Sequence, residues 1–263
     1  MPRTSKRYGV RPARHGCVFG RRRRTEHRSR VPRASSSRSS RLKRRRTIWP
    51  CDVPEGFASV SFAACFVYSP RGVEALCEAS RRLCSRVKAV DREWFPRYAG
   101  LAYRTSLHDP QLKGLFALDV ALVPVPGCTP SSDAPWAAGQ LARALSLVGP
   151  AGRVWPGLER RFAVRKSATA LSGERPTVRE HFESFAVARF AAPSPRIVLV
   201  DDVITKGRTL LAAAMRLHEA FPHADVRAFA LVRTVGFRRR LERLIEPCSG
   251  VIRWVAGDAW REP

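Results

Sequence analysis

Hydrophobic and polar positions follow two alternating patterns from about residue 55 onward. Short apolar runs predict β-strands over residues 57–68, 118–123, 185–190, 197–200, 226–232 and 251–255. Apolar residues three or four positions apart predict helices over residues 73–90, 93–107, 134–148, 209–220 and 237–245. Strands that alternate with helices are typical of a parallel sheet covered on both faces. The sequence therefore predicts an α/β fold in which residues 121–123, 197–200 and 228–232 are parallel neighbours.

The helix predicted over residues 73–90 has the clearest apolar stripe. This stripe consists of Val73, Leu76, Cys77, Ser80, Leu83, Cys84 and Val87, whereas Arg81, Arg82, Arg86 and Lys88 lie elsewhere on the helix. Because Cys77 and Cys84 belong to the stripe, we expect them to be core side chains rather than metal ligands. For the helix over residues 134–148, Asp133 is the predicted N-cap and Gly149-Pro150 the predicted end.

Residues 158–183 form a polar, basic segment with weak periodicity between two predicted strands. A long segment of this kind inside a compact domain is uncommon and is often a functional lid. Its basic residues are Arg160, Arg161, Arg165, Lys166, Arg175 and Arg179. For each single arginine, a solvated surface position is the alternative. His181 titrates in a range that suits proton transfer, although its polar surroundings favour a position on the surface.

Charge divides the 263-residue chain into two parts. The formal net charge is +26, and residues 1–50 carry 18 Lys and Arg against one acid, Glu26. With few apolar residues to bury, residues 1–50 are predicted to be a disordered Arg-rich head. The head could contact nucleic acid or another anionic surface, or serve as a targeting sequence. It could also reflect translation of GC-rich DNA upstream of a later start such as Val53, because Arg greatly outnumbers Lys and Asn is absent.

Seven cysteines are spread along the chain without any C-x-x-C pair or accompanying histidine cluster. This spacing supports neither a zinc ribbon nor a redox motif. The odd number of cysteines favours reduced thiols and a cytoplasmic protein. No apolar run reaches the roughly 18 residues that a membrane span needs, and the basic N-terminus lacks the apolar core of a secretory signal. We therefore expect no membrane partner.

One motif carries most of the functional information. The apolar run Ile197–Val200 leads directly to two adjacent acids, Asp201 and Asp202. In an open α/β sheet, ligands bind at the carboxyl ends of the strands. Because like charges repel, this acid pair does not suit a phosphate; it suits the hydroxyl groups of a vicinal diol. The alternative is that the acids only cap a structural turn between a strand and a helix.

The turn after the acids consists of Thr205, Lys206, Gly207, Arg208 and Thr209. Backbone N–H groups and hydroxyls at the start of a helix suit a phosphate. Gly207 permits a positive φ or the close approach of a ligand, and the two basic residues add favourable charge. A diol site beside a phosphate site describes a ribose 5-phosphate.

The segment 197–209 resembles the phosphoribosyl-pyrophosphate (PRPP) motif of type I phosphoribosyltransferases. Three further segments, 122–126, 158–187 and 229–234, resemble the ComF-like (competence-associated, amidophosphoribosyltransferase-like) branch in wording and order. The resemblance covers residues 60 to 236. It implies a Rossmann-like parallel sheet with a movable hood, built as a phosphoribosyltransferase-like domain over residues 55–236. Residues 237–263 would form a C-terminal helix and strand extension.

The resemblance also implies roles for individual residues. Asp201 and Asp202 would bind the ribose hydroxyls of PRPP, and Thr205, Lys206, Gly207, Arg208 and Thr209 would bind its 5-phosphate. The loop Pro126, Gly127, Cys128 and Thr129 would face the pyrophosphate, and the hood would close over it with Arg161, Arg165, Lys166 and Arg179. The cofactor would be Mg²⁺, held mainly by PRPP rather than by direct protein ligands.

The implied activity is Mg²⁺-dependent transfer of phosphoribose to a nitrogen nucleophile with release of pyrophosphate. The motif does not identify the acceptor or a catalytic residue. Thr205 stands where the 6-oxopurine branch has an aspartate base, which disfavours that branch, whereas orotate-type chemistry stays open. Lys206 stands where a small residue is usual, and the four-cysteine ribbon of many ComF-type chains is missing. The alternatives are a non-catalytic PRPP- or nucleotide-binding regulator and a competence-type accessory protein in DNA uptake. A homodimer, and nucleic acid bound through the head, are compatible with these features.

Overall fold

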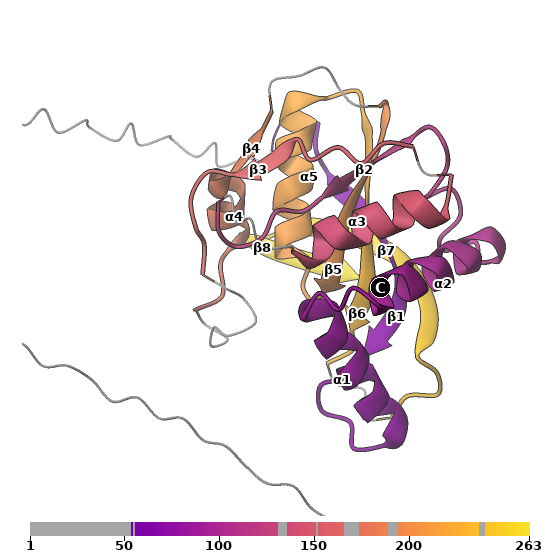
Figure 1. Cartoon of the computed structure of the whole chain (residues 1–263). Helices are drawn as coiled ribbons and strands as arrows, with labels where there is room; N and C mark the ends of the chain where they lie inside the picture. The colour runs from indigo at the N-terminus through magenta and orange to yellow at the C-terminus, as the bar shows by residue number, and fades with distance from the viewer. Residues whose placement is uncertain are drawn as a thin grey trace, which may run out of the picture. The chain divides into compact units, whose positions relative to one another are not determined.

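The computed structural model describes residues 54, 56–130, 136–150, 152–165, 174–188, 194–236 and 240–263 (Figure 1). The predicted disordered head, residues 1–50, lies outside the described residues. The strands are β1 (Ser59–Tyr68), β2 (Val120–Pro124), β3 (Leu158–Arg160), β4 (Phe185–Val187), β5 (Arg196–Ile204), β6 (Asp225–Thr234), β7 (Ile245–Val255) and β8 (Asp258–Glu262). The helices are α1 (Ala75–Lys88), α2 (Trp94–His108), α3 (Ala137–Val148), α4 (Val178–Ser184) and α5 (Arg208–Ala220).

A six-stranded, mostly parallel sheet with the order β2-β5-β6-β1-β7-β8 forms the centre of the fold. The first four strands of this order are parallel, with Leu122 opposite Val198 and Val200 opposite Phe229. The prediction that residues 121–123, 197–200 and 228–232 are parallel neighbours is therefore confirmed. The α/β class is also confirmed, since helices follow β1, β2 and β5 as the alternating pattern predicted.

Helices cover both faces of the sheet. On one face, α1, α2 and α3 pack on strand residues such as Val198 and Phe229. On the other face, α5 packs on Ile197 and Leu199, and α4 lies beside α5. Each fully buried Leu or Ile contributes roughly 1.5–3 kcal/mol through removal of its apolar surface from water. Among the helices that the structure describes, none is long and apolar enough to cross a membrane.

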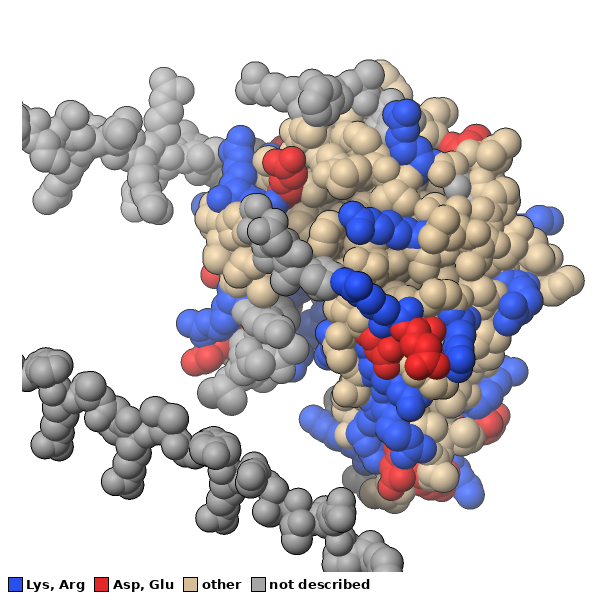
Figure 2. Space-filling view, in the orientation of Figure 1, with Lys and Arg blue, Asp and Glu red and all other residues tan. Residues whose placement is uncertain are grey.

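The amphipathic pattern predicted for residues 73–90 is confirmed in α1, with one exception. Cys77 and Cys84 are buried as expected, and Figure 2 shows Lys and Arg side chains gathered over the outer side of this region. Val73 was assigned to the apolar stripe but is 85% exposed, because α1 begins only at Ala75. In the described part of the chain, five cysteines form no disulfide bond: Cys65, Cys77, Cys84, Cys128 and Cys248.

Several predicted boundaries shift. The helix after β2 begins at Ala137 with Trp136 as N-cap, while Asp133 lies outside the described residues. Gly149 ends this helix as predicted. The helix predicted over residues 237–245 is wrong for its described part, since Arg240–Leu244 is not helical and Ile245 begins β7. Antiparallel pairing with the open edge of β1 outweighs the local charged pattern there.

The segment 158–183 is more ordered than its weak periodicity suggested. β3 pairs with β4 in an antiparallel two-stranded sheet, and α4 begins with a capping box in which Thr177 and Glu180 bond each other's backbone N–H groups. We call residues 158–187 the hood. Residues 166–173 of the hood lie outside the described residues. The hood lies beside α5, the helix that follows the acid pair.

Candidate functional site

The candidate site lies where β2 and β5 separate at the carboxyl end of the sheet. Their last backbone contact is the hydrogen bond from the Val125 N–H to the Val200 carbonyl oxygen, at 2.9 Å. Beyond it the chain leads from β2 to α3 on one face of the sheet, and from β5 to α5 on the other. Such a switch point, where neighbouring strands lead to opposite faces of the sheet, is the usual ligand site of open α/β sheets. Beyond Val200, β5 pairs only with β6, through Asp201, Val203 and Ile204.

Asp201 and Asp202 lie within β5 at this switch point, so the strand continues through the acid pair rather than ending before it. The Asp202 N–H donates a hydrogen bond of 2.9 Å to Asp201 Oδ1. Burial, and then the charge of the Asp202 carboxylate, raise the pKa of Asp201 well above its usual value. A carboxyl group that keeps its proton can both donate and accept hydrogen bonds. The pair therefore suits hydroxyl groups better than a second anion.

The turn from Thr205 to Thr209 has the backbone that the sequence predicted. Gly207 has a φ of +85°, in the left-handed region that favours glycine, and it is the N-cap of α5. Since glycine has no side chain, the first N–H groups of α5 receive no side-chain cap. The N-terminus of α5 also presents the positive end of the helix dipole. The turn is thus suited to an anion.

The two threonine hydroxyls of the turn have different partners. The exposed Thr205 has its Oγ1 3.2 Å from Oγ1 of Thr234, at the end of β6. Thr209, in the first turn of α5, has its Oγ1 3.3 Å from Nε2 of His181. One hydroxyl is therefore held by the sheet and the other by the hood.

The two basic side chains of the turn contact a carboxylate from the C-terminal hairpin. Arg208 donates from Nε and Nη2 to the two oxygens of Asp258, at 2.5 Å each, and Lys206 Nζ lies 3.5 Å from the same carboxylate. A Cβ placed on Gly207 would lie 2.8 Å from Cδ1 of Ile252 in β7. The hairpin β7–β8 therefore packs directly against the turn. No local pattern indicated this, because Asp258 lies far along the chain.

The loop after β2, predicted to face a pyrophosphate, is joined to the hood. The Gly127 carbonyl oxygen accepts a hydrogen bond from Arg160 Nε at 2.5 Å, and the Cys128 carbonyl oxygen accepts one from the Val164 N–H at 2.8 Å. Gly127 and Thr129 are exposed, and Pro126 is half-buried. Apart from its two chain neighbours, no atom of the described residues lies within 4 Å of a Cβ placed on Gly127.

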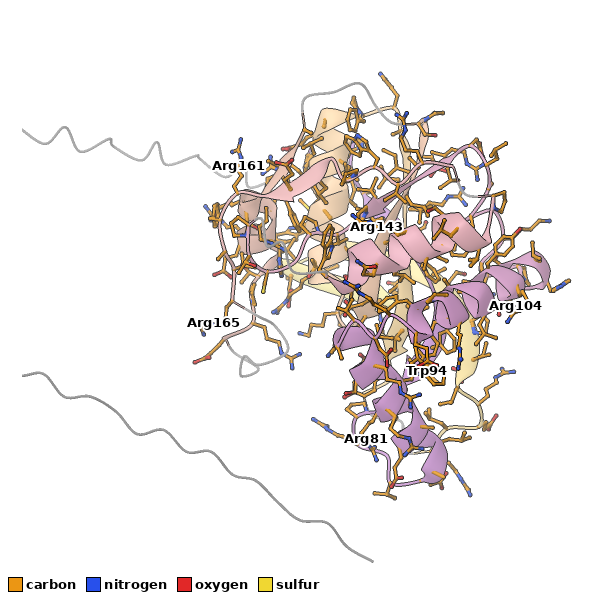
Figure 3. The ribbon with its side chains drawn as sticks, in the orientation of Figure 1. Arg81, Trp94, Arg104, Arg143, Arg161 and Arg165 are labelled. Carbon is orange, nitrogen blue, oxygen red and sulfur yellow. The ribbon has the colours of Figure 1, made fainter. Side chains whose placement is uncertain are left out.

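Of the four arginines and lysines predicted to close the hood, none is placed over the acid pair by a described contact. Arg161 is exposed, and Arg165 and Arg179 form exposed ion pairs with Glu174 and Glu183, each at 2.9 Å. Figure 3 shows Arg161 and Arg165 extending outward from the hood. Lys166 lies outside the described residues, and the Arg175 carbonyl oxygen accepts a long bond from Arg208.

Arg160 is the hood cation that reaches the site. It is 6% exposed, donates from Nη1 to Ser184 Oγ, and lies 4.3 Å above the Phe185 ring. Burial lowers the pKa of Arg160 to about 10, while the nearby Cys128 and Asp201 act in the opposite direction. Among the described residues, no carboxylate forms an ion pair with it. A buried cation without such a partner is suited to an anionic ligand.

His181 is not a surface residue, and that prediction is wrong. Its residue exposure is 4%, because α4 packs this side against α5 and β4. Burial, and then the charge of Arg160, lower the pKa of His181 to about 4. The imidazole is therefore neutral at pH 7. The capping box at Thr177 and Glu180 was the sequence signal for α4, and a helix there would have suggested an inward face.

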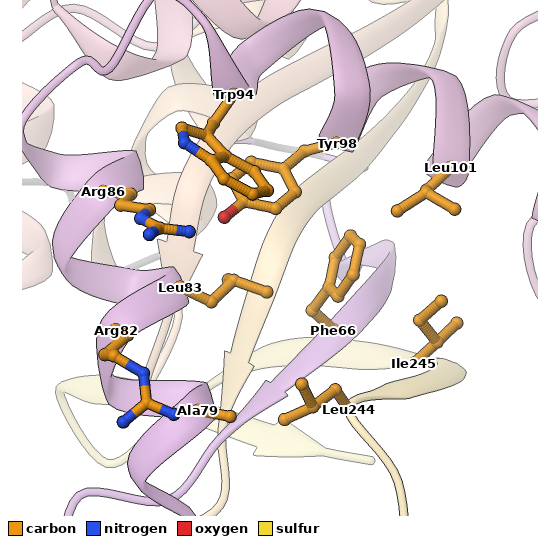
Figure 4. A pocket seen from close by; sticks show the side chains of 10 residues that line it. All are labelled: Phe66, Ala79, Arg82, Leu83, Arg86, Trp94, Tyr98, Leu101, Leu244 and Ile245. Carbon is orange, nitrogen blue, oxygen red and sulfur yellow. The ribbon is translucent and has the colours of Figure 1, made fainter. Parts of the chain in front are cut away.

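A cavity of about 330 Å³ opens elsewhere, between α1, α2 and the start of β7 (Figure 4). It is lined mainly by apolar residues such as Phe66, Leu83 and Tyr98, which belong to the core on the α1–α2 face. The Arg86 guanidinium lies 4.1 Å above the Trp94 ring at this cavity. The cavity therefore lies on the other side of the sheet from His181 and the turn, and it is not part of the candidate site.

The described residues contain no group of three or more His, Cys, Asp or Glu side chains that could hold a metal ion. Asp201 and Asp202 are two carboxylates at the switch point, and hard oxygen ligands of this kind suit Mg²⁺. Comparison with known proteins adds no identification: no protein-family model matches the chain, and no curated protein matches it.

Proposed function

We propose that this chain is a Mg²⁺-dependent phosphoribosyltransferase of the type I, ComF-like kind, which transfers phosphoribose from PRPP to a nitrogen nucleophile. The observation that carries the proposal is the set of groups that meet at the switch point between β2 and β5. An acid pair lies near the end of β5, a positive-φ glycine opens α5 without a side-chain cap, and a buried arginine of the hood interacts electrostatically with Asp201. These groups match a diol, a phosphate and a pyrophosphate in turn.

The acid pair would bind the ribose hydroxyls. Asp201 and Asp202 would accept hydrogen bonds from the 2- and 3-hydroxyl groups, and a proton retained on Asp201 would allow it to donate one as well. The adjoining turn would hold the 5-phosphate through backbone N–H groups of α5 and the Thr209 hydroxyl. Lys206 and Arg208 would attract the 5-phosphate less strongly than an unpaired cation does, because Asp258 balances their charge.

Arg160 and the loop at Gly127 would hold the pyrophosphate. Bond breaking at C1 leaves positive charge on the ribose and negative charge on the departing pyrophosphate. A preorganised cation in a site that excludes water stabilises such a charge strongly. Arg160 meets this condition because it is buried and already fixed by Gly127 and Ser184.

Mg²⁺ would enter with PRPP. The acid pair supplies the hard oxygen donors that the ion prefers, and Mg²⁺ usually keeps several ligands from substrate phosphates. When bound, the ion neutralises charge on the pyrophosphate.

A PRPP- or nucleotide-binding regulator without turnover is the second candidate. Two observations favour it: the turn's cations are paired with Asp258, and the site's histidine is neutral and bonded to Thr209. Among the described residues, no side chain is placed as a general base for an acceptor. Release of pyrophosphate separates the two candidates.

The decisive experiment is calorimetric titration of PRPP, ribose 5-phosphate, inorganic phosphate and nucleoside monophosphates, with and without Mg²⁺. Asp202→Asn is expected to weaken PRPP about ten-fold or more, while inorganic phosphate binds equally or slightly better. Thr209→Val is expected to weaken both ligands. Asp225→Asn, at an exposed surface ion pair on β6, is the matched control.

Two results decide between a transferase, a non-catalytic regulator and a turn with only a structural role. If both site variants bind PRPP within about two-fold of the wild type, the turn is only a structural connection and the proposal fails. If PRPP binds but no pyrophosphate is released with ammonia, purine or pyrimidine acceptors, the protein is a regulator.

A further inference from the structure

His181 is held in place from several sides. It lies on α4, where its own N–H donates to the Thr177 carbonyl oxygen at 3.2 Å. Its ring lies nearly parallel to that of Phe185, with centroids 6.2 Å apart and planes 19° apart. The Ser184 hydroxyl donates to the His181 carbonyl oxygen at 2.6 Å. The ring therefore has a fixed direction, toward α5.

The two ring nitrogens of His181 have unequal surroundings. Nε2 lies 3.3 Å from the Thr209 hydroxyl oxygen. Nδ1 is buried and has no hydrogen-bond partner among the described residues. A neutral imidazole carries one proton, so one nitrogen donates and the other accepts. The position of that proton decides whether the Thr209 hydroxyl accepts a hydrogen bond from the imidazole or donates one to it.

The surroundings favour the proton on Nε2. A proton on Nδ1 would be a buried donor with no acceptor, which is rarer in proteins than an unpaired acceptor. The charged groups that face the ring are Arg160 from β3, Arg208 from α5 and Glu180 on α4 itself. The preference rests on hydrogen bonding, because Nε2 has the Thr209 hydroxyl as a partner whereas Nδ1 has none among the described residues.

We propose that His181 is a positioning residue of the phosphate turn, donating from Nε2–H to Thr209 Oγ1 so that the Thr209 hydroxyl proton is free for a phosphate monoester on α5. With the proton on Nδ1 instead, Nε2 would be an acceptor, and Thr209 would donate its single hydroxyl proton to the imidazole. The inference rests on the proposed function for the anion. In this inference His181, a hood residue outside the phosphate motif, keeps the Thr209 hydroxyl available as a hydrogen-bond donor to the phosphate.

The first test uses the ligand-free protein and does not depend on the proposed function. ¹⁵N NMR of the full-length chain, labelled at its histidines, reports which ring nitrogen carries the proton. The His181 signal is identified by its absence from the spectrum of His181→Gln. We expect the Nε2–H form throughout pH 5.5–8. A signal of the Nδ1–H form, or of a rapidly averaging mixture, overturns the inference.

The second test measures affinity for inorganic phosphate and ribose 5-phosphate. His181→Gln places an amide N–H near the position of Nε2 and is expected to bind within about two-fold of the wild type. His181→Phe keeps the ring but has no donor, and it is expected to lose about five- to ten-fold. His223→Gln, at an exposed histidine, is the control, and thermal melting verifies that each variant is folded.

The outcomes separate this inference from the proposed function. Equal phosphate affinity in the wild type and the folded His181→Phe overturns the inference, while binding itself supports the proposed function. Failure of the glutamine variant to recover affinity also overturns the inference, because a donor at that position would then be irrelevant. Failure of the wild type to bind either ligand overturns the proposed function, and the NMR result then shows separately whether the His181–Thr209 hydrogen bond exists.

Discussion

Arg208 and Asp258 form a two-point ion pair across 50 residues of sequence, with Nε and Nη2 each 2.5 Å from a carboxylate oxygen. The pair joins the first residue of α5 to the first residue of β8. Arg208 Nη1 also lies within 3.5 Å of the carbonyl oxygens of Arg175 and Pro176 in the hood. One guanidinium thus connects the turn, the hairpin and the hood, and it is engaged before any ligand binds.

Asp258→Asn is expected to bind inorganic phosphate about two- to three-fold more tightly, because Lys206 and Arg208 lose their anionic partner. The same change should lower stability by about 1 kcal/mol, since the pair is partly exposed. The Arg208 hydrogen bond lowers the pKa of Asp258, so this stabilisation is present above the unfolded pKa of about 4. It is lost as the pH falls through the lower folded pKa. Phosphate titration and urea unfolding check both parts, and Asp225→Asn should change neither.

His181 is expected to make the protein less stable in mild acid. Its folded pKa of about 4 lies below the usual 6.5, so between these values the unfolded chain binds more protons than the folded one. Stability therefore decreases as the pH falls from 6.5 toward 4, by up to about 3 kcal/mol. Urea unfolding at pH 7.5, 6 and 5 should show a flatter dependence for His181→Gln. An unchanged dependence would mean that the ring is charged or exposed in the folded state.

Asp201→Asn is expected to stabilise the protein at neutral pH while weakening PRPP about ten-fold. Burial and the Asp202 charge raise the folded pKa of Asp201, so the folded state binds more protons and loses stability as the pH rises above about 4. The amide removes that penalty. Thermal melting at pH 7 should show a rise of about 2–4 °C for each kcal/mol relieved, and no rise near pH 3. A lower melting temperature at pH 7 would contradict this account.

Gly207→Ala is expected to cost about 1–2 kcal/mol, because an L-residue at a φ of +85° is strained. Its Cβ would also lie 2.8 Å from Ile252 Cδ1. Ile252→Val removes that methyl group. In the double variant it should recover the stability lost through the steric contact, but not the stability lost through backbone strain. Urea unfolding of the two single variants and the double variant measures the coupling. If the changes in unfolding free energy of the two single variants add exactly in the double variant, the hairpin and the turn are not coupled by this contact.

Local patterns predicted the part of the site that a short stretch of chain builds by itself. The apolar run before Asp201 predicted the strand. Thr-x-Gly-x-Thr predicted a turn in which Gly207 would have a positive φ or allow close approach of a ligand, and the structure shows the positive φ. The inward position of His181 depends on packing between α4 and α5. The capping box at Thr177 and Glu180 could have predicted the helix, but seven residues give too little periodicity to show which side of it is buried. The role of Asp258 depends on the pairing of β7 with β1, and the charged residues before β7 suggested a helix instead.

The two hydrogen bonds between the hood and the loop after β2 also bear on movement. Arg160 bonds the Gly127 carbonyl oxygen, and the Val164 N–H bonds that of Cys128. Opening the hood alone would break both bonds, whereas moving the two segments as one rigid body would keep them. Under the proposed function, pyrophosphate entry and departure would therefore be a single concerted event, in which the loop moves with the hood and both enclose the substrate together.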